Sequence, residues 1–130
     1  MQKILIVEDD QAISAMYEYK IKKEGYRVAF AYSGTEGYQL CKTMQPDVLL
    51  LDLHMPGLHG DALLEKIRKQ SWGADIKTII LTNISKNEAP MKLRLLGVER
   101  YIIKAHSAPG QVAQVIAEVL AKYQSKPITS

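Results

Sequence analysis

Short runs of aliphatic residues recur along the chain, and stretches with helical periodicity fill the intervals between them. Such runs need not alternate with polar residues when helices cover both faces of a parallel sheet, so we interpret them as buried strands. The predicted strands lie near residues 3–7, 26–31, 47–51, 77–81 and 100–103, and the predicted helices near 10–24, 35–44, 60–70, 87–96 and 109–123.

The repeated alternation of strand and helix predicts βαβ units with right-handed crossovers. The expected fold class is therefore α/β, with a single doubly wound, five-stranded parallel sheet and five helices. Capping boxes at residues 33–36 and 85–88 indicate two helix starts, while Gly25 and Gly97 stand where two helices should end. An apolar stripe on the last helix is expected to face the sheet; it consists of Val112, Val115, Ile116, Val119 and Leu120.

The length of 130 residues and the hydrophobic content of 47% fit one domain with its own core. We expect this domain over residues 1–123, and a tail or linker stub over 124–130, where periodicity is lost around Pro127. The only cysteine, Cys41, excludes an internal disulfide and favours a reducing compartment. Without a signal-like or bilayer-length apolar segment, we expect a cytoplasmic protein without a membrane partner.

The net charge of +3 is too small to argue for direct nucleic-acid binding. The segment from Lys86 to Lys104 alone carries a local excess equal to that of the whole chain. Two explanations remain open: a solvated helix face, which we favour, and a surface for an acidic partner.

Polar residues that can carry chemistry follow four of the predicted strands. These are the blocks Glu8-Asp9-Asp10 and Asp52-Leu53-His54-Met55-Pro56, together with Thr82 and Lys104. Ligands of open α/β sheets bind beyond the carboxyl ends of the strands, so we expect these side chains to meet there. Carboxylates, a hydroxyl and an ammonium match what a divalent cation and a phosphoryl group require.

Adjacent carboxylates repel each other unless a cation or a proton lies between them, and Mg²⁺ bound by Asp9, Asp10 and Asp52 is one solution. In the alternative interpretation Asp10 is only the N-cap of the first helix. Asp52, at the end of the most hydrophobic strand, can act as a nucleophile toward phosphorus and form an acyl phosphate. Thr82 and Lys104 can donate to the phosphoryl oxygens, although either can also be an ordinary helix-entry or solvated residue.

With these residues the chain resembles the receiver domain of bacterial two-component response regulators, from Lys3 to about Tyr123. The resemblance rests on Glu8-Asp9-Asp10, Asp52-x-x-Met55-Pro56-x-x-x-Gly60, Thr82 and Gly97-x-x-x-Tyr101-Ile102-x-Lys104. It implies a flavodoxin-like sheet with strand order 2-1-3-4-5.

The resemblance also implies a role for each matching residue. Asp52 is then the phosphoacceptor, Lys104 pairs with the phosphate, and Thr82 and Tyr101 form a switch pair. Mg²⁺ is held by Asp9, Asp10, Asp52 and the His54 carbonyl. The protein is accordingly a signalling phosphoacceptor that catalyses only its own phosphorylation and dephosphorylation.

The implied phosphodonor is a sensor histidine kinase or a phosphotransfer protein, and the implied target is a downstream output protein or domain. A homodimer is expected to use the face made by the fourth helix, the fifth strand and the fifth helix. Phosphorylation is expected to remodel this same face.

The chain departs from the family pattern at three positions. Members of the family usually have proline after the lysine, joined by a cis peptide, but here the pair is Lys104-Ala105. A cis bond before alanine costs about 2.5 to 4 kcal/mol, so we expect a trans bond and a shifted loop. Asn83 and His54 are expected to alter access of water to the acyl phosphate. The His54 ring is alternatively a metal ligand or pH sensor.

Three rival functions remain at this stage. A pseudo-receiver keeps the fold as an interaction module but is never phosphorylated. A hydrolase with an aspartyl nucleophile would need a second catalytic acid near the nucleophile, and His54 stands at the position where that acid is expected. A flavin-binding module is disfavoured because Glu8-Asp9-Asp10 would repel a flavin phosphate.

Overall fold

The structure, a computed structural model, describes residues 1–124 and contains one five-stranded parallel sheet. The strands are β1 (Lys3–Val7), β2 (Arg27–Ala31), β3 (Val48–Leu51), β4 (Lys77–Thr82) and β5 (Val98–Ile103). Their order, β2-β1-β3-β4-β5, confirms both the α/β class and the strand order implied by the resemblance. The predicted tail lies outside the described residues except for Gln124, which ends the last helix.

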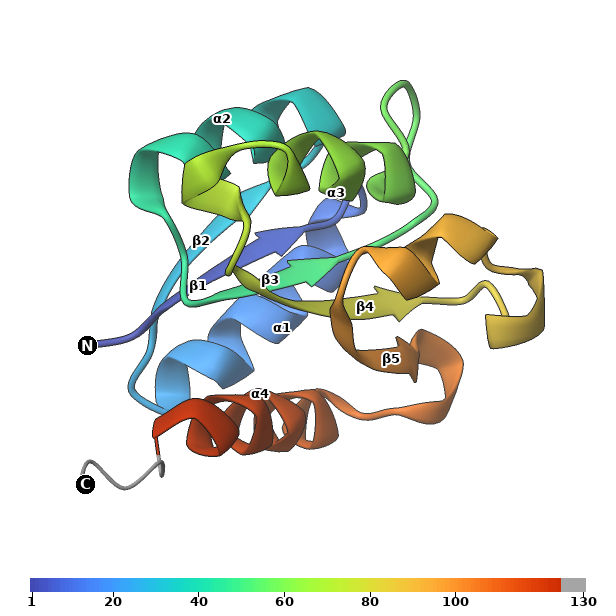
Figure 1. The fold of residues 1–130 in the computed structure, drawn as a ribbon. Coiled ribbons are helices and arrows are strands. Elements are labelled where there is room, and N and C mark those ends of the chain that lie inside the picture. Colours follow the sequence, from blue (N-terminus) through green and yellow to red (C-terminus); the bar gives the residue numbers. More distant parts are fainter. Residues whose placement is uncertain (125–130) are drawn as a thin grey trace.

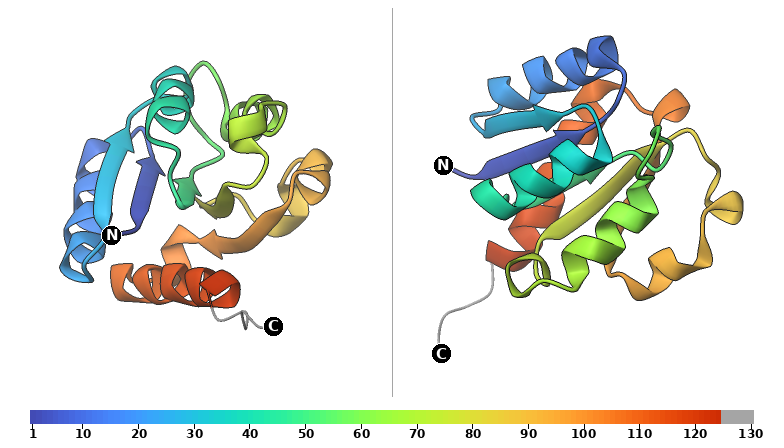
Figure 2. Two further views of the ribbon diagram at one scale, coloured as in Figure 1. Left: turned by 60° about the vertical axis from the view of Figure 1, so that its left-hand side comes forward. Right: turned by 90° about the horizontal axis from the view of Figure 1, so that it is seen from above.

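Helices cover both faces of the sheet, as Figures 1 and 2 show. The helices are α1 (Gln11–Lys23), α2 (Gly34–Met44), α3 (Gly60–Arg68) and α4 (Pro109–Gln124). One apolar cluster joins the sheet to α1 and α4, and a second joins its other face to α2 and α3. The stripe predicted on the last helix packs into the first cluster, as expected.

The predicted helix over residues 87–96 is wrong. Two short 3₁₀ segments, Lys86–Glu88 and Met91–Leu95, take its place, so the described residues hold four α-helices instead of five. Pro90 explains the break, because proline has no N–H and forces the preceding residue out of the helical region. Ala89 is accordingly extended, with φ −70° and ψ 149°.

Of the two predicted capping boxes, only the one at residues 33–36 caps a helix. Ser33 Oγ accepts the Glu36 N–H at 3.2 Å and caps α2, as predicted, whereas the Glu36 carboxylate accepts from Tyr32 N–H at 2.7 Å and not from Ser33. The hydroxyl of Ser85 instead donates to the Glu88 carboxylate at 3.1 Å and caps no amide.

Gly25 follows α1 with φ 97°, in the left-handed region that the predicted helix end requires. Cys41 is fully buried in the core, and burial raises the pKa of its thiol to about 12. It therefore packs as a small hydrophobic residue. None of the helices formed by residues 1–124 is long and apolar enough to cross a membrane.

Candidate metal and phosphoryl-acceptor site

The carboxyl ends of β1, β3 and β5 bring Glu8, Asp52 and Lys104 together, although these residues are far apart in the sequence. The Lys104 ammonium donates to Asp52 Oδ2 at 2.9 Å and also to the Glu8 carboxylate. All three side chains are largely removed from solvent, with exposed fractions of 5%, 7% and 11% for Glu8, Asp52 and Lys104. The structure thus joins the predicted nucleophile to the predicted lysine.

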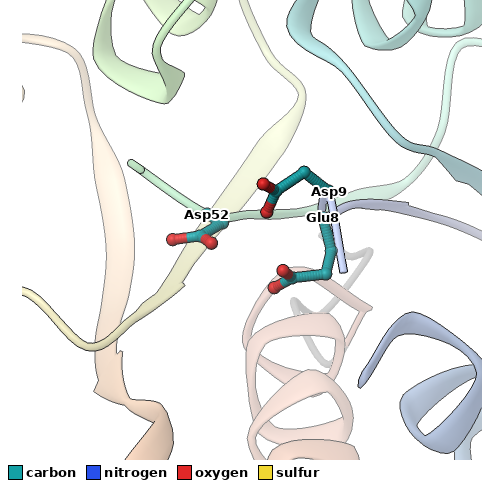
Figure 3. Close-up of side chains that lie close together, drawn as sticks. All are labelled: Glu8, Asp9 and Asp52. Atoms are coloured by element: carbon teal, nitrogen blue, oxygen red, sulfur yellow. The ribbon is translucent and has the colours of Figure 1, made fainter. Parts of the chain in front are cut away.

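Three carboxylates form one acidic group at this edge of the sheet. Oxygens of Glu8, Asp9 and Asp52 all lie within 4.8 Å of one another, and Figure 3 shows the three side chains gathered around one point. Asp9 is exposed, whereas the other two are buried. An all-oxygen group with one side open to solvent fits Mg²⁺, which binds a few carboxylates and keeps several waters.

The acidic group does not include Asp10, which the sequence analysis had placed among the metal ligands. Asp10 Oδ1 accepts the N–H groups of Ala12 at 3.0 Å and Ile13 at 3.1 Å, so its side chain caps α1. The third carboxylate of the group is Glu8, which the sequence analysis expected at this edge of the sheet but did not name as a metal ligand. The sequence left Asp10 open as the N-cap of the first helix, which would leave Glu8 and Asp9 as the acidic pair after β1, but its pattern does not decide between the two pairs.

Substitutions at Asp9 and Asp10 are expected to separate these roles. Asp10→Ala should lower the free energy of unfolding by about 1 kcal/mol, because it removes the cap of α1, but should leave Mg²⁺ affinity unchanged. Asp9→Asn should weaken Mg²⁺ binding without a comparable loss of stability. Urea unfolding and Mg²⁺ titration of both variants check this, and weaker metal binding by Asp10→Ala would return Asp10 to the ligand set.

The pKa values of Glu8 and Lys104 are both shifted in this site. Burial raises the pKa of the Glu8 carboxyl above its ordinary 4.5, against the opposing effect of Lys104. Burial also disfavours the charged form of Lys104, but its bonds to Glu8 and Asp52 outweigh this and raise its pKa above 10.5. Burial therefore dominates for Glu8, whereas the two carboxylates that share the ammonium together outweigh burial for Lys104.

Folding stability in the absence of metal should therefore depend on the charge of Glu8. A carboxyl whose pKa is raised on folding binds its proton more tightly in the folded state, so stability is lost as pH rises from 4.5 through the raised value. Glu8→Gln should flatten this part of the profile. Chemical unfolding from pH 4.5 to 8 in chelator checks it, and a profile unchanged in the variant would contradict the assignment.

A backbone N–H in the loop after β3 holds the Asp52 side chain. The His54 N–H donates to Asp52 Oδ1 at 3.2 Å. The loop turns back at Gly60, where a Cβ would lie 2.1 Å from the Asp52 carbonyl oxygen, so only glycine fits. The His54 side chain is exposed, and its ring is stacked with that of His59 at 6.2 Å between centroids.

The predicted switch residues both contact the segment that follows β4. Thr82 is fully buried, and its hydroxyl accepts the Ile84 N–H at 3.4 Å. The Tyr101 hydroxyl donates to the Ile84 carbonyl at 2.7 Å. Burial raises the pKa of Tyr101, with further contributions from Asp52 and Glu88. The Lys104–Ala105 peptide is trans, as predicted.

The fold and site together define a class of protein: a parallel α/β domain with an acidic group and a lysine at the carboxyl edge of its sheet. The chain belongs to the response regulator receiver domain family, because the model of that family matches residues 4–117. This confirms the resemblance stated from the motifs and makes the protein a module of two-component signalling.

Solved structures agree with this assignment. A CheY-like response regulator receiver domain protein from Methanospirillum hungatei JF-1 is 29% identical, with 98% of this chain and 99% of that chain covered and a TM-score of 0.86. The receiver domain of Francisella response regulator 1452 is 25% identical, with coverage of 95% and 100% and a TM-score of 0.84. Chemotaxis protein CheY4 of Vibrio cholerae, 24% identical over 92% and 98% with a TM-score of 0.84, shares the fold.

Proposed function

We propose that the protein accepts a phosphoryl group on Asp52 from a sensor histidine kinase or a phosphotransfer protein. The observation that carries the proposal is the contact of Asp52 Oδ2 with the Lys104 ammonium at 2.9 Å, beside the carboxylates of Glu8 and Asp9. A nucleophilic carboxylate next to a fixed cation and a cation-binding group has the parts that phosphoryl transfer requires.

In the proposed reaction an Asp52 oxygen attacks the phosphorus of a phosphohistidine. The new O–P bond forms as the N–P bond of the donor breaks, and the imidazole leaves with the electron pair. The transition state is loose and highly charged, so Lys104 stabilises the oxygens of the transferred group without a separate acid or base. Mg²⁺, held by Asp9, Asp52, Glu8 and the His54 carbonyl, would neutralise further charge.

The phosphoryl group is then the signal for the switch. Thr82 would turn toward its oxygens, and Tyr101 would adjust in the space that Thr82 leaves. The contacts of both residues with Ile84 support this, because a movement of the segment after β4 reaches both at once. The ligand can only redistribute conformations that the domain already samples.

The affected surface consists of residues 86–95, β5 and α4. A groove there is lined by apolar and basic residues that include Pro90, Met91, Leu93, Tyr101, Lys86 and Arg94. An output protein or domain, or a second copy of this chain, would bind this face. Much of the local positive charge is already paired, since Lys92 binds Asp61 and Glu65 and Arg100 binds Glu118. A cytoplasmic location fits this role.

Incubation with phosphoramidate and Mg²⁺ tests the proposed function directly. Intact-protein mass spectrometry should show the mass gain of one phosphoryl group, peptide mapping should place it on Asp52, and Asp52→Asn should show none. Absence of any gain in the native protein would favour the pseudo-receiver. Continuous release of inorganic phosphate without a covalent species would favour a hydrolase.

A further inference from the structure

Asn83 and Ala105 are joined across the ends of β4 and β5. The two strands pair up to Thr82 and Ile103, and just beyond this pair the Ala105 N–H donates to Asn83 Oδ1 at 3.0 Å. Asn83 directly follows Thr82, and Ala105 directly follows Lys104. We propose that Asn83 is a positioning residue that fixes the Lys104 backbone and thereby holds its ammonium against Asp52. This inference rests on the proposed function of Asp52.

Lys104 depends on such a support more than a short side chain would. Its ammonium lies at the end of a flexible four-carbon stem, so its position follows from the backbone that carries it. On one side that backbone continues from β5, which is paired with β4. On the other side the chain leaves the sheet through a turn closed by the Ser107 N–H on the Lys104 carbonyl at 3.2 Å. The Asn83 bond ties this turn to β4.

A second bond joins β5 to the segment that follows β4. The Tyr101 hydroxyl binds the Ile84 carbonyl, so β5 and its loop hold the segment after β4 at two neighbouring residues. Tyr101 of β5 and Ala105 of the following turn make these bonds and lie on either side of Lys104. A shift of Thr82 toward a phosphoryl group would therefore reach Lys104 through Asn83.

The Asn83–Ala105 bond depends on hydrogen-bonding groups and not on side-chain volume. Both Asn83 and Ala105 are exposed, so little packing is at stake. The contact needs an acceptor at residue 83 and an N–H at residue 105, which a proline there would lack. Leucine at 83 has the same branching at Cγ but no acceptor, whereas aspartate keeps the oxygen.

The test compares Asn83→Leu and Asn83→Asp in the full chain by their rates of Asp52 phosphorylation with phosphoramidate and Mg²⁺ at high salt. Asn83→Leu should lower the maximal rate by roughly threefold to tenfold, the range expected for loss of one hydrogen bond. Asn83→Asp should stay within about twofold of the native rate, because its acceptor remains. Gln39→Leu, which changes an exposed amide on α2, is the matched control and should behave as the native chain.

A double-mutant cycle separates positioning from any general structural effect. If Asn83 acts through Lys104, then Asn83→Leu should have no further effect in a Lys104→Met background. Amide exchange of Ala105, followed by NMR without phosphodonor or metal, should accelerate in Asn83→Leu but not in Gln39→Leu.

The outcomes are distinct. If the native chain gains no phosphoryl group, the proposed function fails and the positioning role fails with it. If the native chain is phosphorylated but Asn83→Leu matches it, only the positioning role is overturned. The same holds if Asn83→Leu slows the Lys104→Met protein as much as it slows the native one.

Discussion

Lys104→Met is expected to slow phosphorylation of Asp52 by phosphoramidate by roughly 10² to 10³-fold, the usual cost of removing one preorganised donor from a charged transition state. Methionine keeps the length of the stem but removes the ammonium that contacts Asp52 and Glu8. Single-turnover rates measured by intact-protein mass spectrometry check the effect. Lys122→Met is the control, because that side chain is 66% exposed and far along α4.

Mg²⁺ affinity of the same variant identifies the cause of the loss. In the native chain the Lys104 ammonium binds oxygens of two carboxylates in the acidic group. Its removal should therefore strengthen Mg²⁺ binding while phosphoryl transfer becomes slower. Slow transfer with weakened Mg²⁺ binding would instead show that the variant has lost the site itself. A rate within threefold of the native one would mean that Lys104 takes no part in transfer.

Most of the fold could be predicted from local pattern alone. The buried strands are continuous aliphatic runs, such as Val48–Leu51, and helical periodicity fills most of the gaps between them. The fourth predicted helix is absent because Pro90 prevails over the capping box at residues 85–88 that indicated its start. The residue before a proline is driven to extended backbone whatever its neighbours favour. That local backbone rule was available from the sequence and should have decided the prediction.

Much of the site could also be predicted, because residues at the carboxyl ends of parallel strands must share one edge. This reasoning brought Asp52 and Lys104 together across 52 positions of sequence. It could not choose between Asp9-Asp10 and Glu8-Asp9, since that depends on where the strand ends and the helix begins, to within one residue. The bond between Asn83 and Ala105 also could not be predicted from the sequence, because it depends on loop geometry and no periodic pattern encodes it.

Arg68→Ala is expected to lower the free energy of unfolding by roughly 3 to 5 kcal/mol, among the largest effects for a single substitution. Arg68, the last residue of α3, joins that helix to β4 and to the turn before β5. Its guanidinium donates to four acceptors: the Leu96 carbonyl at 2.7 Å, the Gly73 carbonyl at 2.8 Å, Thr78 Oγ1 at 3.1 Å and the Gly97 carbonyl at 3.3 Å.

The expected loss is large because Arg68 is partly buried and its partners remain after it is removed. Burial lowers the pKa of the guanidinium, but arginine stays charged, and bonds to a charged donor are worth about 1.5 to 3 kcal/mol each. Arg68→Lys should lose less, because one ammonium can still reach some of these oxygens. The neighbouring exposed Lys69→Ala should change stability by no more than about 0.5 kcal/mol. Urea unfolding of the three variants measures these differences, and a loss below 1 kcal/mol for Arg68→Ala would show that the turn before β5 is held by its own packing.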